Sequence, residues 1–404
     1  MLSEQVVETA IKQAEGCRLL HIVREGGGLA TPSGFVRLKG LLGAVAGVRE
    51  HVLCVGGGWM RQACADAGIE GAELLGIGRG LSTQWRLRQE LCRVGEVDAV
   101  HCDDLGMLWA ADRALPNAKK LLWLRDLPNS KSWRRWLRRR AAKQDGLVML
   151  TGSDISKARL VRMGLNASAI HVLQLGAPVD WLKREIDVTG WRKRWGVIES
   201  VNGTPHMNGH NNGQAVVVGL LCDRPWDVDV RTPALACGLA DMVLNQKVGE
   251  GDLQSRLRVL IDPDVGHRQR AMHLANEFGH RGLLLQESAC RRGWEIASAC
   301  DVLFVIGRES WMSLMCGMLS GKPVIVEGWP EVRSLLGHGD EGVCVIDPNE
   351  KRGAADILTR WARDEQLRTQ AGDLAAAKGV QLFGAENVRH SWAKAINGCM
   401  DQAT

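Results

Sequence analysis

The sequence predicts an α/β protein with two doubly wound parallel-sheet domains. Three observations predict this class. The chain has 404 residues, which exceeds the roughly 100–200 residues that one domain ordinarily holds. Short apolar runs alternate with helical patterns along most of the chain. One stretch rich in Asn and Gly interrupts this alternation and divides the chain into two similar halves.

The first half contains short apolar runs that end in turns and are separated by helical patterns. The runs are residues 18–23 (RLLHIV), 51–55 (HVLCV), 98–101 (DAVH), 120–124 (KLLWL) and 146–150 (GLVML). They lack strict alternation of apolar and polar residues, which is typical of strands that are covered on both faces. Helical patterns at 34–45 and 83–92 fall between them. This order predicts right-handed crossovers and a parallel sheet.

Residues 201–214 (VNGTPHMNGHNNGQ) have the composition of a linker. Apolar runs then resume at 215–221, 257–261, 282–285, 301–306 and 323–326. The helical patterns of this half are 232–244, 268–278, 291–299, 311–320, 354–361 and 385–400. The predicted domains are therefore 1–200 and 215–384, followed by a C-terminal helix in residues 385–404. Two such sheets on a flexible connection predict a cleft where the strands' carboxyl ends meet.

The composition is that of a folded globular protein, with 45% hydrophobic and 24% charged residues. The net charge of +5 fits small anionic ligands or a membrane surface better than dedicated nucleic-acid binding. The twelve cysteines include no C-x-x-C pair, so we expect a reducing compartment and no zinc site. The sequence has no long apolar run, so we expect a cytoplasmic protein, at most peripheral at the inner face of a membrane.

An ordered set of short motifs occupies residues 301–348. The motifs are Asp301 before an apolar strand, Glu309-Ser310-Trp311, Gly321-Lys322-Pro323-Val324, Gly328-Trp329-Pro330-Glu331, and Gly342 with Asp347-Pro348. In this order they resemble the donor domain of the retaining family-4 glycosyltransferases of GT-B fold. The first half resembles that family more loosely, at 98–103 (DAVHCD), 151–153, 163–165 and 175–180 (LGAPVD).

The resemblance implies transfer of a sugar from a nucleoside diphosphate donor to a glycan, a lipid-linked or a small-molecule acceptor. It implies retention of configuration, no metal and no other cofactor, and a C-terminal helix that crosses back to the acceptor-side domain. Glu309 would hold the donor sugar, and Arg224 would neutralise the diphosphate. Glu331 and Gly328 would lie on the far side of the sugar.

Physical chemistry supports the same placement. The turn that enters a helix at Ser310, Trp311 and Met312 offers free backbone N–H groups and the positive end of the helix dipole to a diphosphate. The triple glycine Gly26, Gly27 and Gly28 after the first run would let the acceptor-side backbone approach the phosphate and the sugar closely. His101, at the end of a predicted strand, completes the candidate site.

Two departures from the family's pattern fall one in the donor domain and one in the acceptor domain. The family carries a second glutamate, and the two alignments of this segment place that position at Gly317 or at Cys316. The family's T-x-H-D motif is replaced here by Leu124-Arg125-Asp126. Both departures favour an altered donor or a relative that has lost turnover.

Other interpretations stay open at this point. A binding protein of the same fold without turnover would explain the missing acid. Gly56, Gly57 and Gly58 resemble half of a dinucleotide-binding motif, which would suit a nicotinamide-dependent oxidoreductase. The triple glycine at 26–28 is compatible with a simple turn, Glu309 with a solvated carboxylate and His101 with a core histidine. Glu331 could cap the helix that follows it.

Residues 132–143 (SWRRWLRRRAAK) form the strongest cluster of positive charge. Between Trp133 and Lys143 the basic residues alternate with Trp136 and Leu137 at helical spacing, which suits contact with an anionic membrane surface. The alternative is a solvated helix whose tryptophans pack inward. A nucleic-acid role is disfavoured because no nucleic-acid-binding fold accompanies this segment.

Overall fold

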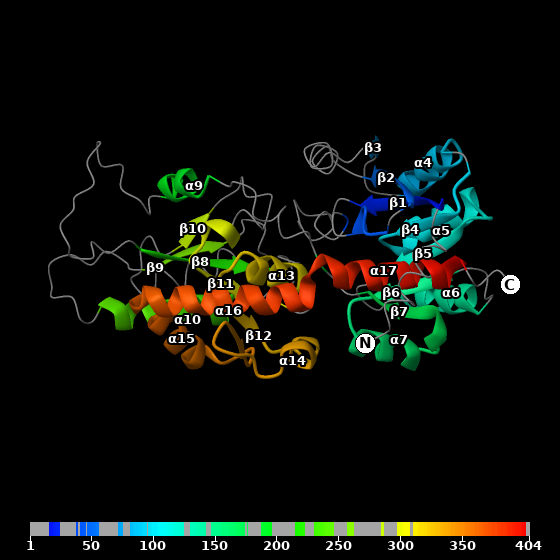
Figure 1. Cartoon of the computed structure of the whole chain (residues 1–404). Helices are drawn as coiled ribbons and strands as arrows, with labels where there is room; N and C mark the ends of the chain where they lie inside the picture. Colours follow the sequence, from blue (N-terminus) through cyan, green and yellow to red (C-terminus); the bar gives the residue numbers. More distant parts are fainter. Residues whose placement is uncertain are drawn as a thin grey trace. The chain divides into compact units, whose positions relative to one another are not determined.

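The computed structural model shows two compact units, each built on one parallel sheet (Figure 1). The first unit holds residues 1–30, 34–178 and 383–404, and the second holds residues 31–33 and 179–382. The structure describes residues 16–24, 38, 41–45, 47–55, 72–75, 81–94, 96–124, 130–142, 147–173, 176, 187–195, 215–222, 230–245, 257–261, 284–286, 297–307 and 310–400. The predicted linker 201–214 therefore lies outside the described residues.

The first unit contains a sheet of seven strands in the order β3-β2-β1-β4-β5-β6-β7. The strands are β1 (Arg18–Arg24), β2 (Arg49–Val55), β3 (Ala72–Leu75), β4 (Ala99–Cys102), β5 (Lys119–Trp123), β6 (Leu147–Thr151) and β7 (Ile170–Val172). Every neighbouring pair is parallel. The order reverses at β1, which is the doubly wound arrangement that the sequence predicts.

Four helices cover one face of this sheet. They are α4 (Leu81–Leu91), α5 (Leu105–Ala114), α6 (Lys131–Ala141) and α7 (Asp154–Arg162). Each contributes buried side chains to a core shared with alternate strand residues such as Leu20, Ile22 and Val100. Side chains alternate between the faces of a strand, so His21 and His101 point to the other face. There they meet Trp392 of the C-terminal helix α17 (Ala385–Met400).

The second unit contains six parallel strands in the order β10-β9-β8-β11-β12-β13. They are β8 (Val216–Leu221), β9 (Leu257–Ile261), β10 (Leu284–Gln286), β11 (Val302–Val305), β12 (Val324–Glu327) and β13 (Val343–Ile346). Helices α10 (Arg231–Asn245) and α15 (Lys351–Arg363) share a core on one face of this sheet. Helix α13 (Trp311–Leu319) packs on the opposite face, against β11 and β12.

Small residues bring helix α16 (Glu365–Phe383) close to the end of α13. Gly372 lies directly against the carbonyl of Gly321, and a Cβ atom at Gly379 would lie 2.9 Å from the Cβ of Met318. Among the remaining described helices, α14 (Pro330–Leu336) follows β12, and α9 (Val188–Arg194) belongs to the second unit. Arg192 of α9 forms a bidentate ion pair with Asp301, with N···O distances of 2.9 and 3.0 Å. In the described part of the chain, no helix has the length and apolar character needed to cross a bilayer.

Candidate functional site

The candidate site lies at the carboxyl ends of β11 and β12 in the second unit, where the chain turns into α13 and α14. Gly307 follows β11 with a φ of 86°, a backbone conformation that favours glycine. Its N–H donates to Glu327 Oε2 over 2.8 Å. The turns that follow two adjacent parallel strands are therefore tied together at the edge of the sheet where ligands bind in doubly wound folds.

Ser310 is the residue that begins α13, and its hydroxyl does not cap the helix. The Oγ atom donates instead to the carbonyl of Ile306 over 2.6 Å, and the residue is only 6% exposed. The first N–H groups of a helix have no intrahelical partners. The side chain of Ser310 is not the partner of those of α13. Trp311 is half-buried and Met312 is buried at the start of α13, and the binding of a phosphate by their backbone stays a prediction.

Glu327 is a site residue that the sequence interpretation did not single out. Its side chain ends β12, and Oε2 accepts hydrogen bonds from Gly307 N and from Trp329 Nε1, the latter over 3.2 Å. The residue is 6% exposed. An acid directly after the apolar run 323–326 and before a glycine is the signal that could have found it.

Glu331 lies in the first turn of α14 and is 1% exposed. An acidic side chain at this position interacts favourably with the positive end of the helix dipole. Pro330 precedes it at the start of the helix, where a missing N–H costs nothing. The two carboxylates, Glu327 and Glu331, therefore flank the entry to α14 on either side of Gly328.

Arg333 is a second residue that the sequence interpretation missed. Its Nε donates to the carbonyl of Gly328 over 3.0 Å, and its Nη2 lies 2.5 Å from Asp347 Oδ1. A Cβ atom at Gly328 would lie 2.7 Å from Arg333 Nη2. The guanidinium thus lies against the backbone of Gly328, and the motifs at 328–331 and 342–348 meet through this arginine.

The structure also shows the two positions at which the sequence places a missing second acid. A Cβ atom at Gly317 would lie 2.9 Å from Leu303 Cδ1 and 3.2 Å from Val324 Cγ2. Gly317 therefore faces the sheet and has no room for a carboxylate. Cys316 is 3% exposed and is a free thiol. Neither position supplies a second acidic side chain.

Several predicted site residues lie outside the described residues, and their roles stay predictions. They are Glu309, Arg224, Gly26, Gly27 and Gly28. His101 is described and lies in the first unit, away from open surface. It is 1% exposed and is packed between His21 and Trp392, with ring centroids 5.3 and 5.5 Å away. This environment is that of the core histidine, the alternative that the sequence left open.

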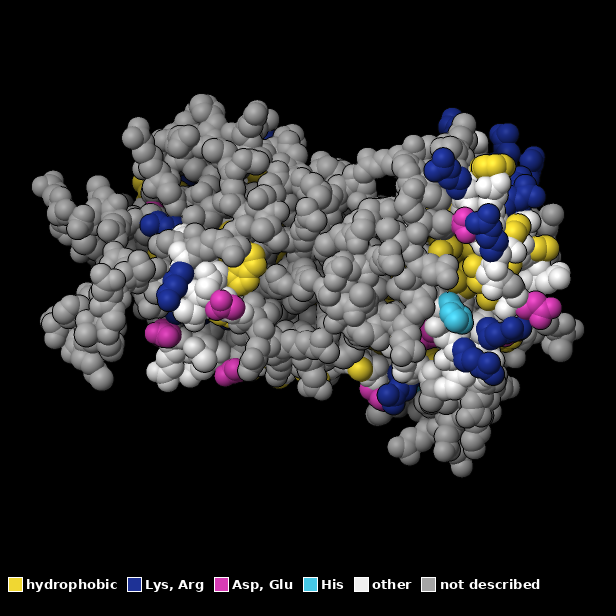
Figure 2. All heavy atoms as spheres, turned by 90° about the horizontal axis from the view of Figure 1, so that it is seen from above, with side chains coloured by type: hydrophobic (Ala, Val, Ile, Leu, Met, Phe, Trp, Pro, Cys, Tyr) yellow, Lys and Arg dark blue, Asp and Glu magenta, His cyan; other side chains and the backbone are white. Residues whose placement is uncertain are grey.

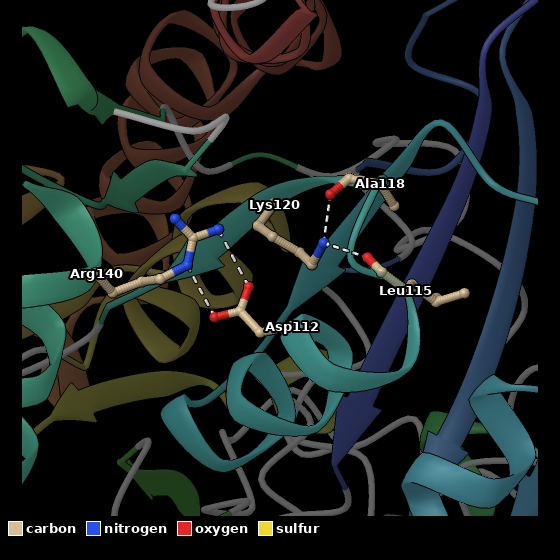
Figure 3. Close-up of polar contacts among 5 residues, drawn as sticks. All are labelled: Asp112, Leu115, Ala118, Lys120 and Arg140. Carbon is tan, nitrogen blue, oxygen red and sulfur yellow. Dashed lines mark hydrogen bonds and ion pairs between the residues drawn. The ribbon is translucent and has the colours of Figure 1, made fainter. Parts of the chain in front are cut away.

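Helix α6 carries the basic segment, and its apolar side chains pack inward. Leu137 is fully buried, Trp136 packs against the core, and the rings of Trp133 and Trp136 meet edge to face at 5.4 Å. Arg140 anchors the helix to Asp112 of α5 through two hydrogen bonds of 2.9 and 3.2 Å (Figure 3). Only the basic face is left exposed. Lys143 lies outside the described residues.

A buried lysine fixes the end of α5 beside this ion pair. Lys120 is 1% exposed, and its Nζ donates to the carbonyls of Leu115, over 2.7 Å, and Ala118 (Figure 3). Burial lowers the pKa of Lys120, and the nearby carboxylate of Asp112 opposes that shift. The lysine thus holds the turn that follows α5, in which the Leu115 carbonyl also accepts from Ala118 N over 3.2 Å. The described residues contain no group of three or more His, Cys, Asp or Glu that could hold a metal.

Two parallel-sheet units of this kind define the GT-B fold, and solved structures of that class match the chain over almost its whole length. HepE from Anabaena, solved in complex with UDP and glucose, has a TM-score of 0.69 at 16% identity, covering 94% of this chain and 99% of that chain. Sucrose-phosphate synthase from Thermosynechococcus elongatus has a TM-score of 0.65 at 14% identity, covering 95% and 99%.

A UDP-N-acetylglucosamine 2-epimerase is also similar, with a TM-score of 0.53 at 11% identity over 89% of this chain and 90% of that chain. No family model matches the sequence, and no curated protein matches it either. At these identities the likeness establishes the fold. The activity has to be argued from the site.

Proposed function

We propose that this chain is a glycosyltransferase whose second unit binds a nucleoside diphosphate sugar. The observation that carries the proposal is the place of the α13 N-terminus, which comes after β11 at the carboxyl edge of the sheet, where Gly307 N–H donates to Glu327. Such a helix end binds phosphate through backbone N–H groups and its dipole. The GT-B fold and the UDP complexes of HepE support this choice of ligand.

The finer assignments follow the predicted roles. Glu309 holds hydroxyls of the donor sugar, and Arg224 together with the backbone of 310–312 neutralises the diphosphate. Charge stabilisation of a leaving group is often the largest catalytic contribution. Glu331 and Gly328 lie toward the sugar, and Gly26, Gly27 and Gly28 serve the acceptor side. Transfer proceeds with retention and without a metal. His101 supports the acceptor-side sheet from inside.

The experiment is a thermal-shift panel of UDP, GDP, ADP, their sugar conjugates and NAD. A ligand at a hundredfold over its dissociation constant adds about 2.7 kcal/mol of stability. We expect one nucleoside diphosphate to raise Tm, and Glu309→Ala and Arg224→Ala each to remove that rise. Glu341→Ala, an exposed acid in the same unit, is the matched control and should leave it intact. Stabilisation by NAD alone would contradict the proposal and favour an oxidoreductase.

A binding protein without turnover is the second candidate, and one observation favours it. Neither Gly317 nor Cys316 offers the second carboxylate of the donor motif. Nucleotide binding with no hydrolysis and no transfer to any acceptor, measured by release of the nucleoside diphosphate, would support this candidate. Transfer with retention, read from the anomeric protons of the product by NMR in the presence and absence of EDTA, would support the enzyme.

We also propose that the helical layer α4–α7 contacts an anionic membrane surface. Figure 2 shows Lys and Arg side chains, in dark blue, gathered on the first unit at the right of the view. Arg135, Arg138 and Arg139 of α6 are exposed, and Trp85 of α4 is the most exposed large apolar side chain of the described residues at 59%. Basic residues near an anionic surface each contribute about 1 kcal/mol.

Vesicle co-sedimentation tests this contact. We expect binding to vesicles with anionic lipid, weak binding to neutral vesicles, and at least a tenfold loss in R135E/R138E/R139E. The control is K351E/R352E/R360E, which reverses three exposed charges of α15 in the other unit. Equal loss in both triple variants would mean that overall charge, not this surface, governs binding.

A further inference from the structure

The buried face of the first sheet holds a cluster of ionisable side chains that the proposed function does not use. His21 of β1 and His101 of β4 are register partners in neighbouring strands. Their Nδ1 atoms lie 3.1 Å apart, which is hydrogen-bonding distance. Glu50 of β2 lies beside them, with Oε1 3.5 Å from His21 Nε2. We call these three residues the imidazole cluster.

Helix α17 packs over the two histidines of the imidazole cluster. Trp392 is fully buried, and its ring centroid lies 6.0 Å from that of His21 and 5.5 Å from that of His101. The two histidines are 0% and 1% exposed. The strands that carry them are paired on both sides within the sheet. The cluster is therefore closed by α17 on the side of the two histidines and by the segment of Gly43, whose N–H donates to Glu50 Oε2 over 2.7 Å, on the side of Glu50.

The hydrogen bond between the two imidazoles limits how many protons the cluster can hold. One Nδ1 must donate and the other must accept. A first added proton is tolerated, because His21 can then donate from Nδ1 to His101 and point Nε2–H toward Glu50. A second added proton makes both Nδ1 atoms donors and places two cations 3.1 Å apart, which removes the hydrogen bond and adds repulsion.

We propose that the imidazole cluster is a proton-sensitive lock, which holds α17 on the first unit at neutral pH and releases it on acidification. An exposed histidine has a pKa of about 6.5. Once α17 is displaced, the two imidazoles can separate, and each can then bind a proton without facing a second cation 3.1 Å away. Below that pH the uncovered state binds more protons, and linkage then favours release of α17.

Two further titratable groups at α17, His171 and Cys399, have pKa values that burial shifts. His171 of β7 lies under Gly398, whose added Cβ would be 2.8 Å from the ring. Burial, then Lys157 and Lys394, lower the pKa of His171, so its contribution to stability is full above about 6.5 and is lost as the pH falls. Burial raises the pKa of Cys399 to about 12, so that thiol stays neutral throughout.

Chain connectivity gives the lock a consequence beyond local stability. Helix α16 belongs to the second unit and α17 to the first, with the division after Leu382. Release of α17 would therefore leave the end of the chain joined only through α16 of the second unit. Gly176, which has no room for a Cβ atom against Val388, shows that the start of α17 is fitted closely to the first unit in the locked state.

Hydrogen exchange of the full-length protein tests the lock. The readout is the protection of residues 385–400 divided by that of α15, whose core lies in the second unit, after correction for the intrinsic pH dependence. A pKa difference of one unit corresponds to about tenfold in this equilibrium, so we expect at least a tenfold loss of relative protection from pH 7.5 to pH 5.5. His101→Asn keeps a polar partner for His21 Nδ1 without titrating and should reduce the pH-dependent loss to the smaller part that His171 contributes.

Three further variants make the result decisive. Glu50→Gln removes the counter-charge and should move the loss to higher pH, which also tests the lock if His101→Asn fails to fold. His390→Asn, on the same helix but outside the cluster, should keep the wild-type profile. His171→Asn should keep most of the loss. A flat wild-type profile, an unchanged profile in Glu50→Gln, or loss of the pH dependence in His171→Asn would each overturn the proposal.

Discussion

The ammonium group of Lys120 is held inside the first unit by two carbonyl oxygens at the end of α5. Burial lowers its pKa below the ordinary value of about 10.4. In the pH range just below that value the unfolded chain binds more protons than the folded chain, so the contribution of Lys120 to stability rises with pH.

The prediction concerns the difference in unfolding free energy between wild type and Lys120→Met. The unfolding free energy of wild type should rise relative to that of Lys120→Met as the pH rises from 7.5 to 10, by at most about 1.4 kcal/mol per pH unit. Urea denaturation at several pH values measures it, and groups common to both proteins cancel. Lys119→Met, on the same strand, controls for the loss of a lysine charge. A pH-independent difference would contradict the prediction.

Gly317 is one of the two positions at which the alignments place the missing second acid, and its close contacts leave little room for a side chain. Helix propensity alone would make Gly317→Ala stabilising by about 0.5–1 kcal/mol. The Cβ would however lie 2.9 Å from Leu303 Cδ1, a fully buried side chain. We therefore expect destabilisation by about 1–3 kcal/mol from overpacking, measured by urea denaturation. A rise in stability would mean that α13 stands farther from β11 than described.

At the scale of elements, α6 is joined to α5 by the pair Arg140 and Asp112, whose side chains are only 14% and 17% exposed. Bidentate pairs with little exposure couple strongly, and exposed pairs contribute about 0.2–1 kcal/mol. A double-mutant cycle with Arg140→Gln and Asp112→Asn should give a coupling of about 1–3 kcal/mol. The exposed pair Arg93 and Glu90 is the control, and similar couplings in the two cycles would refute the distinction.

The sequence predicted most strands of both sheets, because apolar runs such as 216–221 are buried on both faces. Helix α16 was missed for a physical reason. It packs through Gly372, Ala375 and Gly379, so it lacks the periodic large apolar side chains by which a helix is found in sequence. Strand β3 was also missed, because four residues (AELL) carry too short a pattern.

The candidate site was predictable where residues follow one another in sequence and not where distant segments meet. The place of Ser310, Trp311 and Met312 at the start of a helix was predictable because a strand, a turn and a helix follow one another in sequence, and their role in binding stays a prediction. Arg333 was not predictable, because its importance comes from contact with Gly328 and Asp347. His101 carried a site prediction because strand ends attract function, whereas its side chain points to the face that α17 covers.

At the scale of the whole molecule, the chain combines two units whose cores share no residue. The same fold occurs in a sucrose-phosphate synthase and in an epimerase, so the fold alone does not choose the reaction. The start of α13 and Glu327 both belong to the second unit. The proposed donor site therefore lies in that unit, and α17 and the imidazole cluster belong to the first.

Separate cores predict that the two units respond independently to core substitutions. Trp392 of α17 is fully buried in the first unit, and Trp361 of α15 is 3% exposed in the core of the second. Replacing either with Ala should cost about 3–5 kcal/mol in its own unit alone. Hydrogen exchange should show Trp392→Ala exposing β1 and β4 while β12 stays protected, and Trp361→Ala doing the reverse. If each variant loosened both sheets equally, the units would unfold as one, and a donor-site ligand would then also stabilise α17.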